Sequence, residues 1–292
     1  MDVVVIGNAG VDTCVYLHGD RVDESVEANF TTNRDAVGQA GGYASRGYAA
    51  LGYATAFIGA LGDDGAGAQV RMQLAQDGVD LRGVFPDPQG TARSINLVFP
   101  DGRRKNFYDG MGHMTLTPDL APLRPILSGA RLAHVNIPNW ARQLLPLLRE
   151  LGLPIAVDLQ DVVAADDPYR ADFVAAADIV FFSATNHPDP TSLMRAYWDR
   201  NPRLTQVAGM GARGCALGRA GAITFYAPPA FDWPVVDTNG AGDALAVGFL
   251  AASVLEGLTL IEAIRWGQTA ARRTCAQRVP KNALARRQEL EL

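Results

Sequence analysis

A run near the end of the chain has the composition of an anion-binding turn. It reads Asp237-Thr238-Asn239-Gly240-Ala241-Gly242-Asp243 and is followed at once by an apolar stretch, 244–255. Gly240, Ala241 and Gly242 carry little or no side chain, so their backbone N–H groups can close around an anion. The apolar stretch has the length and composition of a helix, whose positive N-terminus would face that anion.

Asp243 would then be a carboxylate in the first helical turn, beside the bound anion. It should repel phosphate, unless it takes a proton from a hydroxyl group that attacks the phosphate. The run therefore predicts phosphoryl transfer, with Asp243 as general base and Gly240 to Gly242 as the anion hole. The alternative is ordinary helix capping, because Asp is common both before such a turn and in a first turn.

The full pattern, Asp-Thr-x-Gly-Ala-Gly-Asp-x-x-x-x-Gly, is completed by Gly248. It resembles the C-terminal signature of the ribokinase-like (PfkB) sugar kinase family. The resemblance implies ATP as the phosphoryl donor and Mg²⁺ bridging its phosphates. It also implies nucleotide contacts from Thr238, Gly240 and Gly242, and a substrate contact from Asn239.

For some members of that family the resemblance further implies a monovalent cation, K⁺, which would lie near Asp237 and Thr238. The four histidines and three cysteines of the chain have no metal-ligand spacing, so we assign none of them to a metal.

Glycines between residues 38 and 65 form a second constellation, in which Gly41-Gly42 precedes a stretch of small residues. One interpretation is tight turns and close helix packing. The spacing also resembles the family's N-terminal signature, which implies that Gly41 and Gly42 contact the substrate. The family's substrate-binding asparagine on the helix that follows is replaced here by Arg46 or, in another register, by Tyr43. We expect Arg46 to take that role.

Asp12 follows the first predicted strand, and ligands of open α/β sheets bind beyond the carboxyl ends of the strands. A carboxylate there can hold two adjacent hydroxyl groups of a polyol. Relatives carry a sugar-binding Asp at the corresponding position. A turn-forming Asp is the alternative.

The stretch 209–214 matches the dinucleotide fingerprint formally, but the residues after it lack the helix that the fingerprint must open. It better resembles the family's nucleotide loop, with Ala208 in place of a threonine. That resemblance implies nucleotide contacts from Gly209, Gly211 and Gly214.

Asn186 begins a segment similar to the family's Asn-x-x-Glu, which helps to organise water around Mg²⁺. Asp189 stands where the family has Glu. We therefore place Asn186 at the nucleotide, with an ordinary loop as the alternative.

Composition narrows the functional class. The 292 residues are 48% hydrophobic and 20% charged, with a net charge of −5, which argues against nucleic acid or an anionic membrane as the main partner. No apolar run reaches the ~20 residues that span a bilayer, and the N-terminus carries Asp2 where a signal peptide would be basic. The odd, scattered cysteines favour reduced thiols and a cytoplasmic protein.

Strand and helix patterns alternate strictly from about residue 128 onward, which predicts βαβ units and a parallel sheet. With the resemblance, we expect one domain over 1–292, a ribokinase-like three-layer α/β/α sandwich with a mainly parallel sheet. Two polar, strand-like segments, roughly 13–36 and 88–112, would form a small β lid, and a homodimer could form through it. We expect the following strands and helices: strands at 3–6, 54–59, 94–99, 104–108, 132–136, 154–159, 179–183, 204–208 and 222–226; helices at 69–75, 140–151, 169–176, 192–198, 244–255 and 261–273.

Together these features predict ATP-dependent phosphorylation of a hydroxymethyl group on a small sugar or sugar-like alcohol. Three alternatives remain at this point. The first is a nucleoside kinase, which the lid aromatics Tyr16, Phe30, Phe107 and Tyr108 would favour. The second is a sugar-phosphate kinase, which would use Arg93, Arg103, Arg104 and Lys105. The third is a non-catalytic sugar- or nucleotide-binding relative, against which Asp243 argues.

Overall fold

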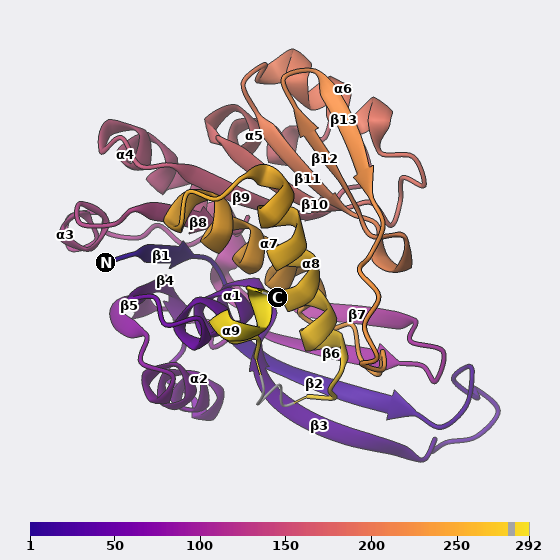
Figure 1. Cartoon of the computed structure of the whole chain (residues 1–292). Helices are drawn as coiled ribbons and strands as arrows, with labels where there is room; N and C mark the ends of the chain where they lie inside the picture. The colour runs from indigo at the N-terminus through magenta and orange to yellow at the C-terminus, as the bar shows by residue number, and fades with distance from the viewer. Residues whose placement is uncertain (280–283, 292) are drawn as a thin grey trace.

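The computed structural model describes residues 1–279 and 284–291, and its centre is a nine-stranded sheet (Figure 1). The strand order is β13-β12-β11-β10-β9-β8-β1-β4-β5. All neighbours are parallel except β11 with β12 and β12 with β13. The strands are β1 (Val3–Ile6), β4 (Thr55–Leu61), β5 (Asp80–Pro86), β8 (Leu132–Val135), β9 (Ile155–Asp161), β10 (Ile179–Ser183), β11 (Thr205–Gly209), β12 (Cys215–Arg219) and β13 (Ala222–Tyr226).

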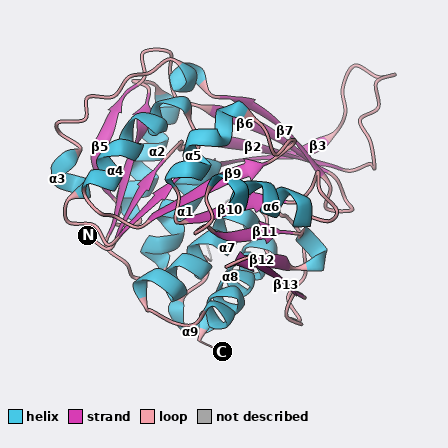
Figure 2. Ribbon diagram, turned by 90° about the horizontal axis from the view of Figure 1, so that it is seen from above, coloured by secondary structure: helices cyan, strands magenta, loops and turns pink. Residues whose placement is uncertain are grey.

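Helices cover both faces of this sheet, as Figures 1 and 2 show, which gives the predicted three layers. One layer holds α1 (Gln39–Ala50), α2 (Gly65–Gln76), α7 (Ala241–Leu250), α8 (Leu260–Cys275) and α9 (Arg287–Leu290). The other holds α3 (Arg124–Leu127), α4 (Leu145–Glu150), α5 (Ala171–Ala176) and α6 (Thr191–Arg200). Strand β1 is apolar throughout because it touches both layers. Val3 and Val5 face the α7 side, and Val4 and Ile6 face the other.

The predicted elements lie close to the observed ones, with differences of local geometry. The helix expected over 140–151 begins as a 3₁₀ segment, Asn139–Leu144, before α4, and α5 follows a 3₁₀ turn at Pro168–Arg170. The apolar stretch 244–255 does not form one α-helix, because α7 ends at Leu250 and continues as a π-helical turn, Ala251–Leu255. Strands β5 and β12 were not predicted.

A second, four-stranded sheet forms a lid whose strands come from two parts of the chain (Figure 1). Its order is β3-β2-β6-β7, and only the central pair, β2 with β6, is parallel. The strands are β2 (Gly10–Leu17), β3 (Thr31–Gly38), β6 (Arg93–Val98) and β7 (Arg104–Asp109). The predicted hairpin at Asp101-Gly102 is present between β6 and β7, with Gly102 at a φ of 83°.

Asp12 lies inside strand β2 of the lid rather than in a turn after β1, so the turn-forming alternative is wrong. Alternation along β2 places Asp12, Cys14 and Tyr16 on one face of the lid. Cys14 and Tyr16 contact the segment before α7, which identifies this face as the inner one. In the paired strands the inner positions are Ser94, Asn96 and Val98 on β6, and Arg104, Asn106 and Tyr108 on β7.

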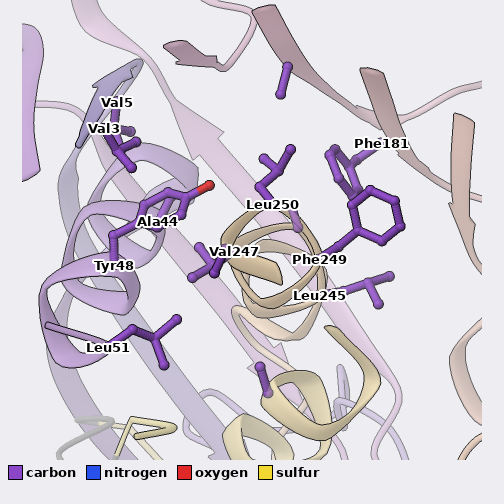
Figure 3. Packing of buried hydrophobic residues seen from close by; sticks show 14 of the residues in the cluster. Val3, Val5, Ala44, Tyr48, Leu51, Phe181, Leu245, Val247, Phe249 and Leu250 are labelled. Carbon is purple, nitrogen blue, oxygen red and sulfur yellow. The ribbon is translucent and has the colours of Figure 1, made fainter. Parts of the chain in front are cut away.

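Helix α7 is held between α1, the sheet and α8. Figure 3 shows Val247 directed toward α1 and Phe249 directed toward Phe181 of β10, and the two phenyl rings meet edge to face at 5.6 Å between centroids. On the α8 side, a Cβ at Gly248 would lie 2.7 Å from the carbonyl oxygen of Trp266. The last glycine of the C-terminal signature is therefore required by close helix packing.

Within the residues that the structure describes, no helix combines the length and apolar character needed to cross a membrane.

Candidate active site

The N-terminus of α7 opens onto unfilled space. Gly240 precedes the helix in the left-handed region, at a φ of 74°, and its carbonyl accepts the first helical hydrogen bond from Ala244 at 2.9 Å. Gly242 lies in the first turn, and a Cβ placed there would have no atom within 4 Å. The arrangement has two properties expected of an anion hole: a positive helix end and room for a ligand.

Asp243 stands in that first turn and is partly buried. Burial raises the pKa of its carboxyl group well above the ordinary value, and the charges of Asp158 and Asp12 raise it further. The guanidinium group of Arg104 opposes these effects. A carboxylate with a raised pKa can accept a proton near neutral pH, as a general base must.

Asp158 belongs to the site and was not predicted from the sequence. It lies in β9, is 6% exposed, and accepts a hydrogen bond from the backbone N–H of Gln160 at 2.8 Å. Burial raises the pKa of its carboxyl group to about 6. The signal was available, since a charged residue within the otherwise apolar run 155–159 of a buried strand must serve some purpose.

Asp12 belongs to the lid and faces the same site as Asp243. It is 4% exposed. Its carboxylate accepts hydrogen bonds from the hydroxyl group of Ser94 and, at 3.2 Å, from the backbone N–H of Gln39. Burial raises the pKa of this carboxyl group, while the two hydrogen bonds lower it. Arg104 acts electrostatically on both Asp12 and Asp243, so the structure brings the predicted substrate ligand and the predicted base together.

Asn239 joins the lid to the anion-binding turn. Its side-chain amide makes hydrogen bonds with protein groups, which does not support the expected contact with substrate. It is 1% exposed. Its Oδ1 accepts from Arg104 at 2.7 Å, and its Nδ2 donates to Asp237 at 2.7 Å and to the Cys14 sulfur at 3.4 Å. The amide is used to hold β2 and β7 against the turn.

Asp237 is fully buried, and its carboxylate is engaged by protein donors. It accepts from the Tyr16 hydroxyl at 2.6 Å and from the backbone N–H of Asn239 at 2.9 Å. With a further hydrogen bond from the Asn239 amide, three of the roughly four acceptor sites of this carboxylate are occupied by protein donors. The contact of Asp237 with K⁺ that the resemblance implied stays a prediction. No group of three or more His, Cys, Asp or Glu side chains in the described part of the chain could hold a metal.

Arg46 pairs with Asp77 at 2.7 Å, and this ion pair ties α1 to the end of α2. The expectation that Arg46 binds substrate is not supported by this geometry. Gly41 has a packing role, because its N–H donates to the carbonyl of Asn8 at 2.8 Å and a Cβ there would come within 2.7 Å of the same oxygen. Gly42 packs on Ala9. The start of α1 thus fits closely under the connection between β1 and β2.

The expected nucleotide loop follows β11, which ends at Gly209. A 3₁₀ turn, Gly211–Arg213, leads through Gly214, at a φ of 87°, into strand β12. Because no helix follows, the rejection of the dinucleotide fingerprint is confirmed.

Thr238, which was expected to contact the nucleotide, lies beside the anion-binding turn and is partly exposed. Its backbone carbonyl accepts a hydrogen bond from the N–H of Ala241 at 3.2 Å.

Asn186 is exposed after β10 and donates to the carbonyl of Val162 at 3.3 Å. Asp189 accepts from the backbone N–H of Thr191 at 2.9 Å, at the start of α6. Its carboxylate thus serves the helix start, which favours the ordinary-loop alternative over the role near Mg²⁺ that the resemblance implied.

Comparisons with known proteins agree with this geometry. The model of the pfkB family carbohydrate kinases matches residues 2–136 and 181–285. The acarbose 7(IV)-phosphotransferase of an Actinoplanes species is 33% identical over 279 residues, which cover 94% of this chain and 92% of that protein. The solved structure of a microbiome-derived acarbose kinase is similar at a TM-score of 0.88 and 28% identity, covering 99% of this chain and 97% of the other.

Ribokinase of Arabidopsis thaliana, solved with ribose and ATP, is similar at a TM-score of 0.81 and 23% identity, covering 99% of this chain and 97% of that one. These likenesses confirm the ribokinase-like α/β fold expected from the sequence. The chain therefore belongs to the PfkB family and is an ATP-dependent carbohydrate kinase.

Proposed function

We propose that the chain transfers the γ-phosphoryl group of ATP to a hydroxymethyl group of a sugar or sugar-like alcohol, with Asp243 as general base. The observation that carries this proposal is the position of Asp243 in the first turn of α7, beside the open space at Gly242. Burial there also raises the pKa of its carboxyl group. The acceptor oxygen forms a bond to the γ-phosphorus as the bond from that phosphorus to the β–γ bridging oxygen breaks. ADP leaves with the bridging oxygen, and the hydroxyl proton passes to Asp243.

Backbone N–H groups of Gly240 and Gly242 would stabilise the charge on the transferring group, since they are fixed before the reaction, while the N–H of Ala241 donates to the Thr238 carbonyl. Arg104 would contribute a positive charge from the lid, because it already lies within electrostatic range of Asp12 and Asp243.

The carboxylates of Asp158 and Asp243 fit the binding of Mg²⁺·ATP at the N-terminus of α7. Asp158 and Asp243 raise the free energy of each other's charged form, and a cation near them would relieve that repulsion. Mg²⁺ is usually held by one or two carboxylates together with substrate phosphates, so Asp158 is the residue we assign to it. When bound, the ion would shield the phosphate charge.

The surroundings of Asp12 favour an acceptor without negative charge. The basic residues that a sugar-phosphate kinase would use do not converge: Arg103 pairs with Asp101 at the hairpin tip, and Arg104 bonds Asn239. The carboxylates of Asp12, Asp158 and Asp243 would repel a second phosphate.

A nucleoside acceptor has little aromatic support in the lid. The hydroxyl group of Tyr16 donates a hydrogen bond to Asp237, and Phe30 is 88% exposed. Phe107 alternates with Tyr108 along β7 and faces outward. Tyr16 and Tyr108 are the two at inner positions of the lid, and Tyr108 is the one on the strand position beside Ser94 and Asp12, so a base would have one of the four to stack on.

Acarbose is the first acceptor to test, because two relatives that span nearly the whole chain are named as acarbose kinases. We also propose a cytoplasmic location, supported by Cys14, Cys215 and Cys275, which are buried as thiols rather than joined in disulfides.

The direct test measures ADP production and mass-detected product with ATP, Mg²⁺ and either acarbose, D-ribose or D-fructose. We expect one of these acceptors to be phosphorylated, and Asp243→Asn to lower its turnover by ~10²–10⁴-fold while folding and ATP binding are retained. Product formation by the variant at more than a third of the wild-type rate would remove Asp243 as the base. ATP binding without transfer to any acceptor would instead indicate a binding protein.

The electrostatic pairing of Asp158 with Asp243 predicts a pH effect. Loss of the negative charge in Asp158→Asn should lower the pKa of Asp243, so the acid limb of kcat/KM should move to lower pH. The Asp158 carboxyl has a folded-state pKa of about 6, above the ordinary 3.8, so the stability it contributes is present below the ordinary pKa and lost as pH rises through about 6. The melting temperature of the variant should therefore exceed that of the wild type more at pH 8 than at pH 4.

Asp161→Asn is the matched control, since Asp161 is exposed at the end of the same strand. It should leave both the acid limb and the pH dependence of melting unchanged. An acid limb that does not move in Asp158→Asn, with a melting difference independent of pH, would contradict the pairing.

We also propose a homodimer through the outer face of the lid. This face carries Ile95 and Phe107, which are 48% and 54% exposed, beside the half-buried Val15 and Leu97. An apolar patch on a sheet face is typical of a protein interface. Light scattering should give the mass of a dimer for the wild type and of a monomer for Phe107→Asp. Phe225→Asp, on β13 with the same 54% exposure, should stay dimeric, and a monomeric wild type would contradict the proposal.

A further inference from the structure

We propose that the hydroxyl group of Tyr43 is an acceptor-binding group that works with Asp12, and that it helps to decide which polyols the site takes. This inference rests on the proposed function and names a residue of the acceptor site. Tyr43 lies in the first turns of α1 and is 8% exposed.

The position of Tyr43 connects the acceptor side of the site to the phosphate side. A Cβ at Gly240 would lie 3.1 Å from the Tyr43 ring, so the ring covers the turn that precedes α7. At its other end, the phenol oxygen and Asp12 Oδ2 border the same small space. A Cβ at Gly38 would lie 2.9 Å from the former and 2.1 Å from the latter. Glycine at position 38 therefore leaves this space open.

The Tyr43 hydroxyl is buried and makes no hydrogen bond of full geometry within the described residues. Asp12 is its nearest acceptor, and the weak hydrogen bond between them helps to lower the pKa of the Asp12 carboxyl group. A buried hydroxyl without a partner costs about 1–3 kcal/mol, so a protein that keeps one usually supplies a partner from a ligand or water. The substrate hydroxyl groups expected at Asp12 are the natural partners here.

Gln39 gives independent support from the other side of Asp12. Its backbone N–H donates to Asp12, yet both atoms of its side-chain amide are buried without partners in the described part of the chain. Its φ is 60°, a conformation that non-glycine residues rarely adopt and that tends to persist at functional sites. A Cβ at Gly10, which shares the inner face of β2 with Asp12, would lie 2.6 Å from the Gln39 amide nitrogen.

A hydroxyl group with only a weak contact to Asp12 and an unpartnered amide thus flank one carboxylate. Tyr43 can donate to a substrate oxygen or accept from a hydroxyl, Gln39 can do either, and Asp12 accepts. This set fits an acceptor that presents neighbouring hydroxyl groups. It fits a neutral or amine-bearing polyol better than an anionic one, because the Asp12 carboxylate would repel an anion and the nearby cation, Arg104, is bonded to Asn239.

The test is Tyr43→Phe, which removes the hydroxyl and keeps the ring against Gly240. Steady-state constants are measured with whichever of acarbose, D-ribose and D-fructose the wild type turns over fastest. We expect the acceptor KM to rise roughly three- to tenfold, the effect of one neutral hydrogen bond, with the ATP KM unchanged. The melting temperature of the ligand-free variant should equal or exceed that of the wild type, because a poorly bonded buried hydroxyl has been removed. Tyr197→Phe is the matched control, since it removes another buried, unpartnered hydroxyl, in the core on the opposite side of the sheet, and should change neither constant.

An unchanged acceptor KM in Tyr43→Phe would overturn the inference and leave the proposed function standing, since Phe preserves every packing contact of the ring. Equal changes in the ATP and acceptor constants would overturn it as well, by showing that the residue only shapes the turn. Failure of the wild type to phosphorylate any of the three acceptors would remove the proposed function, and this inference with it.

Discussion

The close packing of α7 against α8 is the constraint on which the site depends. Gly248 brings α7 within contact of the Trp266 carbonyl, and a Cβ at Gly267 of α8 would lie 2.7 Å from the carbonyl of Leu245 on α7. With Phe249 packed on Phe181, the helix cannot slide along its axis without opening the core. Its N-terminus therefore presents fixed backbone donors, and electrostatic stabilisation of a transferring phosphoryl group needs donors that do not have to reorganise.

Around that helix end, charge is concentrated in an arrangement that is unfavourable without ligands. The charges of Asp12 and Asp158 both raise the pKa of Asp243, and burial adds to the cost of the charged form of all three carboxyl groups. Arg104 and the helix N-terminus are the compensating positive groups. The lid contributes charges of both signs to the site, because β2 carries Asp12 and β7 carries Arg104. The Asn239 amide then joins the lid to the anion-binding turn. The lid and the anion-binding turn are thus connected through a small number of polar contacts.

The sequence was sufficient for the features that depend on local pattern. A turn of small residues before an apolar stretch predicted the start of α7, alternating strands and helices predicted the parallel sheet, and Asp101-Gly102 predicted the lid hairpin. The same reasoning could not assign side-chain partners, which depend on tertiary contacts. Arg46 and Asp77 meet because α1 and α2 lie side by side, and nothing in their spacing along the chain indicates it. Tyr16 and Asp237, 221 residues apart, meet only once the lid is placed. Asp158 could have been suspected from its apolar neighbours, but its proximity to Asp243 follows from contact between β9 and α7.

The central claim is that the first turn of α7 receives the phosphoryl group, and Gly242→Val tests it most directly. A Cβ at residue 242 meets no atom within 4 Å outside its chain neighbours and the backbone of its own helix, so the added side chain should leave folding intact and fill the space assigned to phosphate. We predict an unchanged melting temperature and unchanged acceptor binding by calorimetry, with the rate of phosphoryl transfer from ATP reduced at least a hundredfold, the loss expected when oxyanion-type donors are blocked. A folded variant that transfers phosphate at close to the wild-type rate would show that the reaction takes place elsewhere.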